Sequence, residues 1–128
     1  MIYLDTSVAL AQLLAEDRAP PSSLWGEPLI ASRLLEYEIW TRLTARRLGQ
    51  SHSEEARALI QRVALIELAA PVLERALEPF PVPVRTLDAL HLASIAFLLG
   101  RGQTVELASY DDRLLAAAQG LGIPIAAL

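Results

Sequence analysis

The chain has 128 residues, of which 53% are hydrophobic, so it can bury the core of one ordinary domain. It contains no cysteine, which excludes disulfides, thiolate nucleophiles and zinc–thiolate sites. Acidic residues outnumber basic ones by 15 to 11, and this balance taken alone argues against a nucleic-acid partner. No apolar run reaches the length of a membrane span and no basic leader opens the chain, so we expect a cytoplasmic protein without a membrane partner.

Short apolar runs alternate with segments of helical spacing along the whole chain. In chain order the predicted elements are a strand at 2–4, a helix at 7–17, a strand at 29–32, a helix at 33–49, a helix at 54–63, a strand at 64–68, a helix at 71–78, a helix at 87–100, a strand at 104–109, a helix at 111–122 and a strand at 123–128. Two Pro-rich breaks, at 19–28 and 79–84, are expected to be loops within the domain and not boundaries between domains.

Several residues mark the expected ends of these helices. Gly49 is a typical stop, and the run SHSE at 51–54 is typical of a capping box. Pro71 suits the first turn of a helix, and Thr86 is expected to be an N-cap. Strands that alternate with helices predict an α/β fold: a three-layer sandwich in which a central, mainly parallel sheet of four to five short strands is flanked by helices. We expect residues 1–128 to form a single domain.

Two carboxylates follow predicted strands. Asp5 ends the first strand, where a buried charge is costly unless something pairs with it, and Asp111 follows the strand at 104–109. In an open α/β sheet ligands bind at the carboxyl ends of the strands, so both should face one crevice. Asp111 could also serve simply as an N-cap of the helix that follows.

Two further carboxylates lie on predicted helices. Asp88 falls in a first turn, where the helix dipole alone would explain it. Glu38 lies at the edge of an apolar helix face, where Arg42, four residues later, is its simplest partner.

Convergence of all four carboxylates would create strong repulsion that a divalent cation removes. Mg²⁺ and Mn²⁺ prefer carboxylate oxygen, and such an ion can activate water and stabilise phosphoryl displacement. The candidate catalytic and metal-binding residues are therefore Asp5, Glu38, Asp88 and Asp111.

Four stretches of the sequence, IYLDTSV, SRLLEYEIW, TLDALHLASI and ASYDDRL, resemble the four acidic motifs of PIN-domain ribonucleases. They occur in the family's order, span residues 2–114, and are most similar to the VapC-type toxins of bacterial VapBC toxin–antitoxin pairs. The resemblance implies a PIN-like fold and Mg²⁺- or Mn²⁺-dependent cleavage of RNA phosphodiesters. It also implies a cognate antitoxin peptide or protein bound in a hydrophobic groove beside the active site.

The resemblance assigns the family's acidic ligands to the same four carboxylates and adds hydroxyl groups near the metal. Thr6 and Ser7 match the hydroxyl positions of the first motif, and Ser109 stands where the family often has Thr. Two positions stay open to a neighbour. Asp112 competes with Asp111, although the S-x-D spacing favours Asp111, and Glu36 competes with Glu38 in the same way.

RNA binding is compatible with the charge balance once the four carboxylates are assigned to a metal. Without them, 11 acidic residues remain against 11 basic residues, all of which are arginine. Arg42 and Arg46 fall on one helical face and are candidates for RNA contact. His91 is expected to pack or to hold a neighbouring ligand by a hydrogen bond, since a metal would generate the nucleophile without it. A homodimer would cover part of the apolar surface.

Alternatives remain at this point. One is a PIN-domain RNA-processing nuclease without an antitoxin, and another is a non-catalytic PIN-like binding module. A phosphatase that uses Asp5 as its nucleophile is disfavoured, because its motif needs an acid two residues later and Ser7 stands there.

Overall fold

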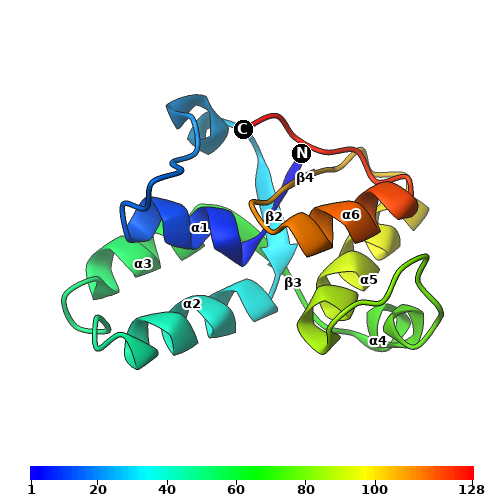
Figure 1. Cartoon of the computed structure of the whole chain (residues 1–128), viewed down its shortest axis with the longest axis horizontal. Helices are drawn as coiled ribbons and strands as arrows, with labels where there is room; N and C mark the ends of the chain where they lie inside the picture. The colour runs from blue at the N-terminus through cyan, green and yellow to red at the C-terminus, as the bar shows by residue number, and fades with distance from the viewer.

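The computed structural model describes all 128 residues, which form a four-stranded sheet with helices on both faces. In chain order the elements are β1 (Ile2–Leu4), α1 (Thr6–Leu13), the short 3₁₀ helix η1 (Ser22–Gly26), β2 (Leu29–Ser32), α2 (Leu34–Ala45), α3 (Ser53–Gln61), β3 (Val63–Ile66), α4 (Ala70–Ala76), α5 (Thr86–Gly100), β4 (Glu106–Ala108) and α6 (Asp112–Gly120). Figure 1 shows the chain with these labels. All the strands pair in parallel, in the order β3-β2-β1-β4.

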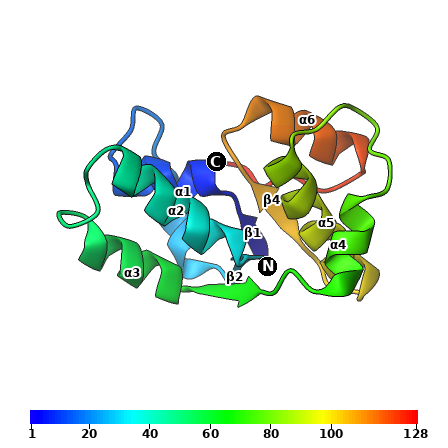
Figure 2. The ribbon, with the colours of Figure 1, turned by 90° about the horizontal axis from the view of Figure 1, so that it is seen from below.

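The sheet lies between two layers of helices. Figure 2 shows α1, α2 and α3 to one side of the strands and α4, α5 and α6 to the other. Side chains alternate along β1, so Ile2 and Leu4 join the core beneath α1–α3 while Tyr3 joins the core beneath α5 and α6. A parallel sheet needs apolar cover on both faces, and these two cores supply it. The predicted three-layer α/β sandwich is confirmed.

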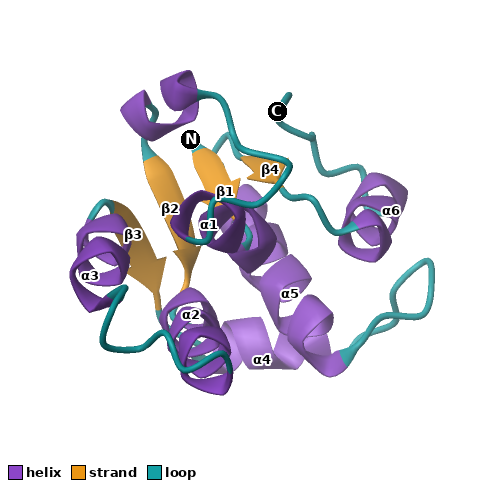
Figure 3. Ribbon diagram, turned by 60° about the vertical axis from the view of Figure 1, so that its left-hand side comes forward, coloured by secondary structure: helices purple, strands orange, loops and turns teal.

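The pairing of β1 with β4 determines where the strand-end residues lie. β1 and β4 are neighbours (Figure 3), and their last residues, Leu4 and Ala108, are paired in register. The amide of Asp5 still donates to the carbonyl of Ala108 at 3.0 Å. Asp5 and Ser109 therefore leave the same edge of the sheet side by side.

Two predicted helix ends are wrong because non-glycine residues end these helices. α2 stops at Ala45, since Arg47 adopts a left-handed φ of 58° and the amide of Leu48 donates back to the carbonyl of Leu43 at 2.8 Å. Gly49, the expected stop, lies beyond this turn. The first helix ends at Leu13, and Ala15, two residues later, adopts a left-handed φ of 49°.

The predicted caps of two helices are also wrong. α3 begins at Ser53 without a side-chain cap, and the Ser51 hydroxyl instead donates to the carbonyl of Leu48 at 3.3 Å, so the capping box does not form. Thr86 is the first residue of α5 and not its N-cap, which is Arg85.

The last predicted strand, at 123–128, is reduced to a single parallel bridge between Ile125 and Leu107. Gly122 adopts φ 73° just before it, and Pro124 has no amide hydrogen to extend the ladder.

No helix in the structure combines the length and the hydrophobicity that crossing a bilayer requires.

Candidate active site

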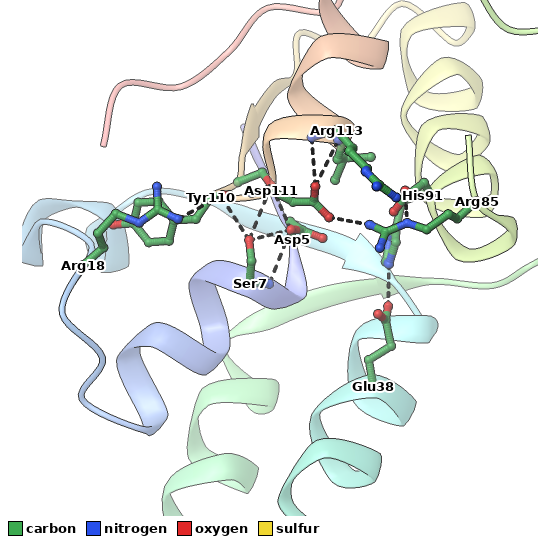
Figure 4. A network of polar contacts seen from close by, with 12 residues as sticks. Asp5, Ser7, Arg18, Glu38, Arg85, His91, Tyr110, Asp111 and Arg113 are labelled. Carbon is green, nitrogen blue, oxygen red and sulfur yellow. Dashed lines mark hydrogen bonds and ion pairs between the residues drawn. The ribbon is translucent and has the colours of Figure 1, made fainter. Parts of the chain in front are cut away.

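Four carboxylates from four different elements line one pocket of about 420 Å³. Asp5 follows β1, Glu38 lies in α2, Asp88 lies in the first turn of α5, and Asp111 follows β4. Asp5 and Asp88 are buried, whereas Glu38 and Asp111 are half-buried. The structure therefore brings together all four residues that the sequence analysis selected. Figure 4 shows the polar contacts around Asp5, Glu38 and Asp111.

Asp5 is held by hydroxyl groups. Its Oδ2 accepts hydrogen bonds from the Ser7 hydroxyl at 2.6 Å, the Ser109 hydroxyl at 2.8 Å and the Ser7 amide at 3.3 Å, the last of which caps α1. The hydroxyl oxygens in turn accept the amides of Tyr110 and Asp111, each at 2.9 Å. One oxygen of Asp5 is thus occupied by protein donors, and Oδ1 has none.

The two carboxylate oxygens of Asp111 have different partners, one in the helix α6 and the other in an arginine side chain. Its Oδ1 accepts the amides of Arg113 and Leu114 at 3.0 and 3.3 Å and so caps α6. Its Oδ2 accepts Nη2 of Arg85 at 2.8 Å, and Nε of the same guanidinium donates to Oδ2 of Asp88 at 3.0 Å. The hydrogen bond to Asp88, with the charges of Asp88 and Asp111, raises the pKa of Arg85 above its ordinary value, so this group is a permanent cation in the pocket.

Glu38 ends a buried chain of polar contacts that crosses from α2 to the centre of the sheet. Its Oε1 contacts Nε2 of His91, whose Nδ1 lies 2.8 Å from the Tyr3 hydroxyl. That hydroxyl also accepts the amide of Ser32 at 3.1 Å. The partner of Glu38 is therefore His91. Arg42, which the helix spacing had suggested, does not pair with Glu38.

The surroundings of these polar contacts shift the pKa values of His91 and Tyr3. Burial lowers the pKa of His91, but the hydrogen bond and charge of Glu38, with the charges of Asp5 and Asp88, outweigh it and raise that pKa above its ordinary value. Burial raises the pKa of Tyr3 far above the usual range of a phenol, so Tyr3 is a neutral partner. His91 consequently presents a proton to Glu38 and anchors that carboxylate against the second layer of helices.

The donor chemistry of the pocket fits a hard divalent cation. Carboxylate oxygens are the ligands that Mg²⁺ and Mn²⁺ prefer, and Oδ1 of Asp5 has no protein donor. In the present arrangement, however, no three acidic or histidine side chains converge closely enough to hold one ion. Arg85 joins Asp88 to Asp111 and balances their charge, and His91 engages Glu38 by a hydrogen bond.

The remaining predicted residues divide between the pocket and its surroundings. Ser7 and Ser109 contact Asp5 as described, and Thr6 lines the pocket with its hydroxyl oxygen buried and without a hydrogen-bond partner. Asp112 is exposed in the first turn of α6 and does not line the pocket, so the position nearest the site is Asp111. Glu36 lies outside it, paired with Arg33 at 3.3 Å.

The two arginines proposed for RNA contact lie at different places. Arg42 lines the carboxylate pocket. Arg46 lines an adjacent depression, which shares Ser7 and Arg42 with the pocket and also contains Arg18 and Tyr110. The two depressions therefore adjoin each other, and the second combines three arginines with the carboxylates of Glu16 and Asp17.

Two residues of the site escaped the sequence analysis. Arg85 stands three positions before Asp88, a spacing that permits an ion pair, but its second contact, to Asp111, spans 26 residues and has no local signal. Tyr3 is a polar group in the middle of a buried apolar strand, and that placement could have indicated a buried partner for its hydroxyl.

Comparison with known proteins identifies relatives along almost the whole chain. The PIN domain family matches residues 2–120. Ribonuclease VapC47 of Mycobacterium tuberculosis (strain CDC 1551 / Oshkosh) is 31% identical over 129 residues, which cover 95% of this chain and 93% of the relative. Ribonuclease VapC46 of M. tuberculosis (strain ATCC 25618 / H37Rv) is also 31% identical, over 98% of this chain and 96% of the relative.

Solved structures share the fold at lower identity. The crystal structure of VapC20 of M. tuberculosis, a sarcin–ricin loop cleaving toxin, has a TM-score of 0.68 at 23% identity and covers 91% of this chain and 95% of that one. A chain of a toxin–antitoxin complex from Klebsiella pneumoniae has a TM-score of 0.67 at 19% identity and covers 94% of each chain. The parallel sheet between two helical layers is therefore the architecture that these proteins share with this chain.

Proposed function

This chain belongs to the PIN domain family, and from that premise we propose that it is a Mg²⁺- or Mn²⁺-dependent endoribonuclease that acts as the toxin of a toxin–antitoxin pair. The observation that carries the proposal is the pocket in which Asp5, Glu38, Asp88 and Asp111 meet from four separate elements. Asp5 and Asp111 also cap helices, but capping does not account for Glu38 and Asp88 in the same pocket. The four together suit a site that concentrates divalent cations.

In this proposal the four carboxylates hold the ion, and the surrounding residues keep them in place. Such an ion, when bound, would supply an activated water molecule and offset the negative charge on the phosphoryl oxygens. Ser7 and Ser109 orient Asp5, so that its free Oδ1 is available for the ion. His91 orients Glu38 from the opposite layer. Arg42, on the pocket wall, is placed to bind a phosphate of the RNA backbone.

Purified protein and defined RNA test the reaction. We expect cleavage with Mg²⁺ or Mn²⁺ and none with a chelator. The Asp5→Asn variant keeps an oxygen that can accept from Ser7 and Ser109 but loses the charge, so it should fold and be inactive. Asp112→Asn removes the same charge from the exposed first turn of α6 and should stay active. Equal activity of the folded Asp5→Asn variant and the wild type would refute the mechanism.

A short pulse of expression tests the biological role. Sequencing of RNA 5′ ends after the pulse, with Asp5→Asn as the control, would report which RNA is cut and at which sequence. Growth arrest that is relieved by the product of a neighbouring gene supports the toxin. Cleavage without growth arrest favours an RNA-processing nuclease instead.

A protein partner is the second part of the proposal. Apolar side chains are exposed from α4 to the start of α5, including Leu73, Leu77 and Leu87, and Leu77 is 88% exposed. We propose that an antitoxin or a second copy of the chain covers these leucines, because contiguous exposed apolar surface marks protein interfaces. Light scattering should report a dimer in the free protein, and Leu77→Asp should shift it towards the monomer while leaving its fold unchanged.

A further inference from the structure

Arg85 is the cation that holds two of the site carboxylates. Its guanidinium donates from Nε to Asp88 and from Nη2 to Asp111, at 3.0 and 2.8 Å, and so spans two elements. Arg42 also lines the pocket, yet it forms no ion pair. Of the two arginines in the wall, only Arg85 occupies a position between carboxylates.

We propose that Arg85 is the resident counter-cation of the pocket, and that a divalent ion binds by displacing its guanidinium from Asp88 and Asp111. The inference rests on the proposed metal-dependent function and adds a residue that controls metal affinity. Arg85 is thus a positioning residue of the metal-free site, where it keeps two negative groups together.

The contacts of Asp111 make the competition direct. Its Oδ1 caps α6 through two backbone amides, so that oxygen is committed to the fold. Its Oδ2 is the oxygen without a backbone donor, and Arg85 holds it. At Asp88 the hydrogen bond to Arg85 also uses Oδ2, while Oδ1 accepts no hydrogen bond from the protein. A metal ion that recruits Asp111 through its uncommitted oxygen therefore meets the guanidinium there, and an ion that binds Asp88 lies beside the same cation.

The guanidinium is placed so that it can leave. The Arg85 side chain is 57% exposed, and its two partners are the only groups that hold it by ion pairs. Arg85 follows the Pro-rich segment 79–84 and occupies the N-cap position of α5, just before the helix. Its side chain makes no capping hydrogen bond to the helix. Because the guanidinium is more than half exposed, water screens both ion pairs even though Asp88 is buried. An ion of twice the charge with oxygen-selective chemistry can therefore replace the guanidinium.

Calorimetric titration with Mn²⁺ alone, without RNA, tests the exchange. Arg85→Gln removes the competing cation and should bind Mn²⁺ about five- to tenfold more tightly than the wild type. Arg42→Gln is the matched control, since it removes the same charge from the same pocket without breaking an ion pair, and its affinity should change by less than about twofold. Arg85→Lys keeps the charge but loses the two-pronged guanidinium that reaches both carboxylates. Its affinity for Mn²⁺ should lie between those of the wild type and Arg85→Gln.

Thermal unfolding in a chelator and in Mn²⁺ supplies a readout without catalysis. With the chelator, Arg85→Gln should melt below the wild type; with saturating Mn²⁺, its melting temperature should rise by more than that of the wild type. Equal affinities, or equal gains in Arg85→Gln and Arg42→Gln, would overturn the exchange while leaving metal binding intact. No Mn²⁺ binding by any folded variant would overturn both the exchange and the proposed function.

Discussion

Two halves of the pocket hold their carboxylates by different means. The strand-end half consists of Asp5 and Asp111, whose oxygens accept backbone amides and cap α1 and α6. The helix half consists of Glu38 and Asp88, whose oxygens contact only the side chains of His91 and Arg85. The strand-end carboxylates are therefore part of the fold. The helix carboxylates are positioned by side chains, of which Arg85 also reaches the cap carboxylate Asp111.

This difference determines what a substitution reports. A change in the strand-end half alters a helix terminus together with the pocket, so loss of activity there is ambiguous without a stability measurement. A change in the helix half alters the pocket alone, provided that no buried partner is left unsatisfied. We rank the following substitutions by their expected effect on the free energy of unfolding.

Asp5→Ala should cause the largest loss of stability. It removes the N-cap of α1 and leaves the hydroxyls of Ser7 and Ser109 without their acceptor. We expect the free energy of unfolding to fall by about 2–4 kcal/mol, measured by urea denaturation. Asp5→Asn retains an acceptor oxygen and should lose about 1 kcal/mol. Equal losses in the two variants would show that the hydroxyl network does not hold this half.

Tyr3→Phe tests whether the buried contact of Tyr3 with His91 helps to hold Glu38 in place. The substitution removes the hydroxyl that contacts His91 and accepts the buried amide of Ser32. We expect a loss of about 1.5–2 kcal/mol in the free energy of unfolding and about a tenfold fall in RNA cleavage, because Glu38 loses the orientation that His91 supplies. Full activity at reduced stability would confine this chain of contacts to the fold.

Asp111→Ala, compared with Asp112→Ala, separates a cap from an ordinary first-turn acid. Asp111 accepts two amides at the start of α6, and its loss should lower the free energy of unfolding by about 1 kcal/mol. Asp112 has no such contact and should lose less than about 0.5 kcal/mol through the helix dipole. Only the Asp111 variant should lose cleavage. If the two unfold alike, the cap does not stabilise α6.

The contrast between the halves also explains what could be predicted from the sequence. Strands 2–4 and 29–32 and the helix through Asp88 follow from local hydrophobic spacing, and the rule for parallel sheets brings Asp5 and Asp111 to one edge. Their capping role is local too, because each carboxylate bonds amides two or three residues ahead.

The helix half depends on contacts that no local pattern contains. Tyr3 and His91 are 88 residues apart, and His91 and Glu38 are 53 apart. Helix spacing suggested Arg42 as the partner of Glu38, and the tertiary contact with His91 prevails because it is buried. Arg47, two residues after the end of α2, shows the same limit, since it adopts a left-handed φ of 58° that residue preference would not predict for arginine.

Apart from the Asp112 controls, Asp88→Asn should change the free energy of unfolding least, while still strongly lowering RNA cleavage. Asp88 caps nothing, and its only side-chain partner, Arg85, is more than half exposed, so the free energy of unfolding should change less than in the three other cases. Cleavage should nevertheless fall at least about a hundredfold, since a neutral amide replaces a proposed metal ligand. Asp112→Asn, with the same chemical change outside the pocket, should leave both quantities near the wild type. A large loss of stability in Asp88→Asn would remove the distinction between the halves, because it would make the helix carboxylates as structural as the caps.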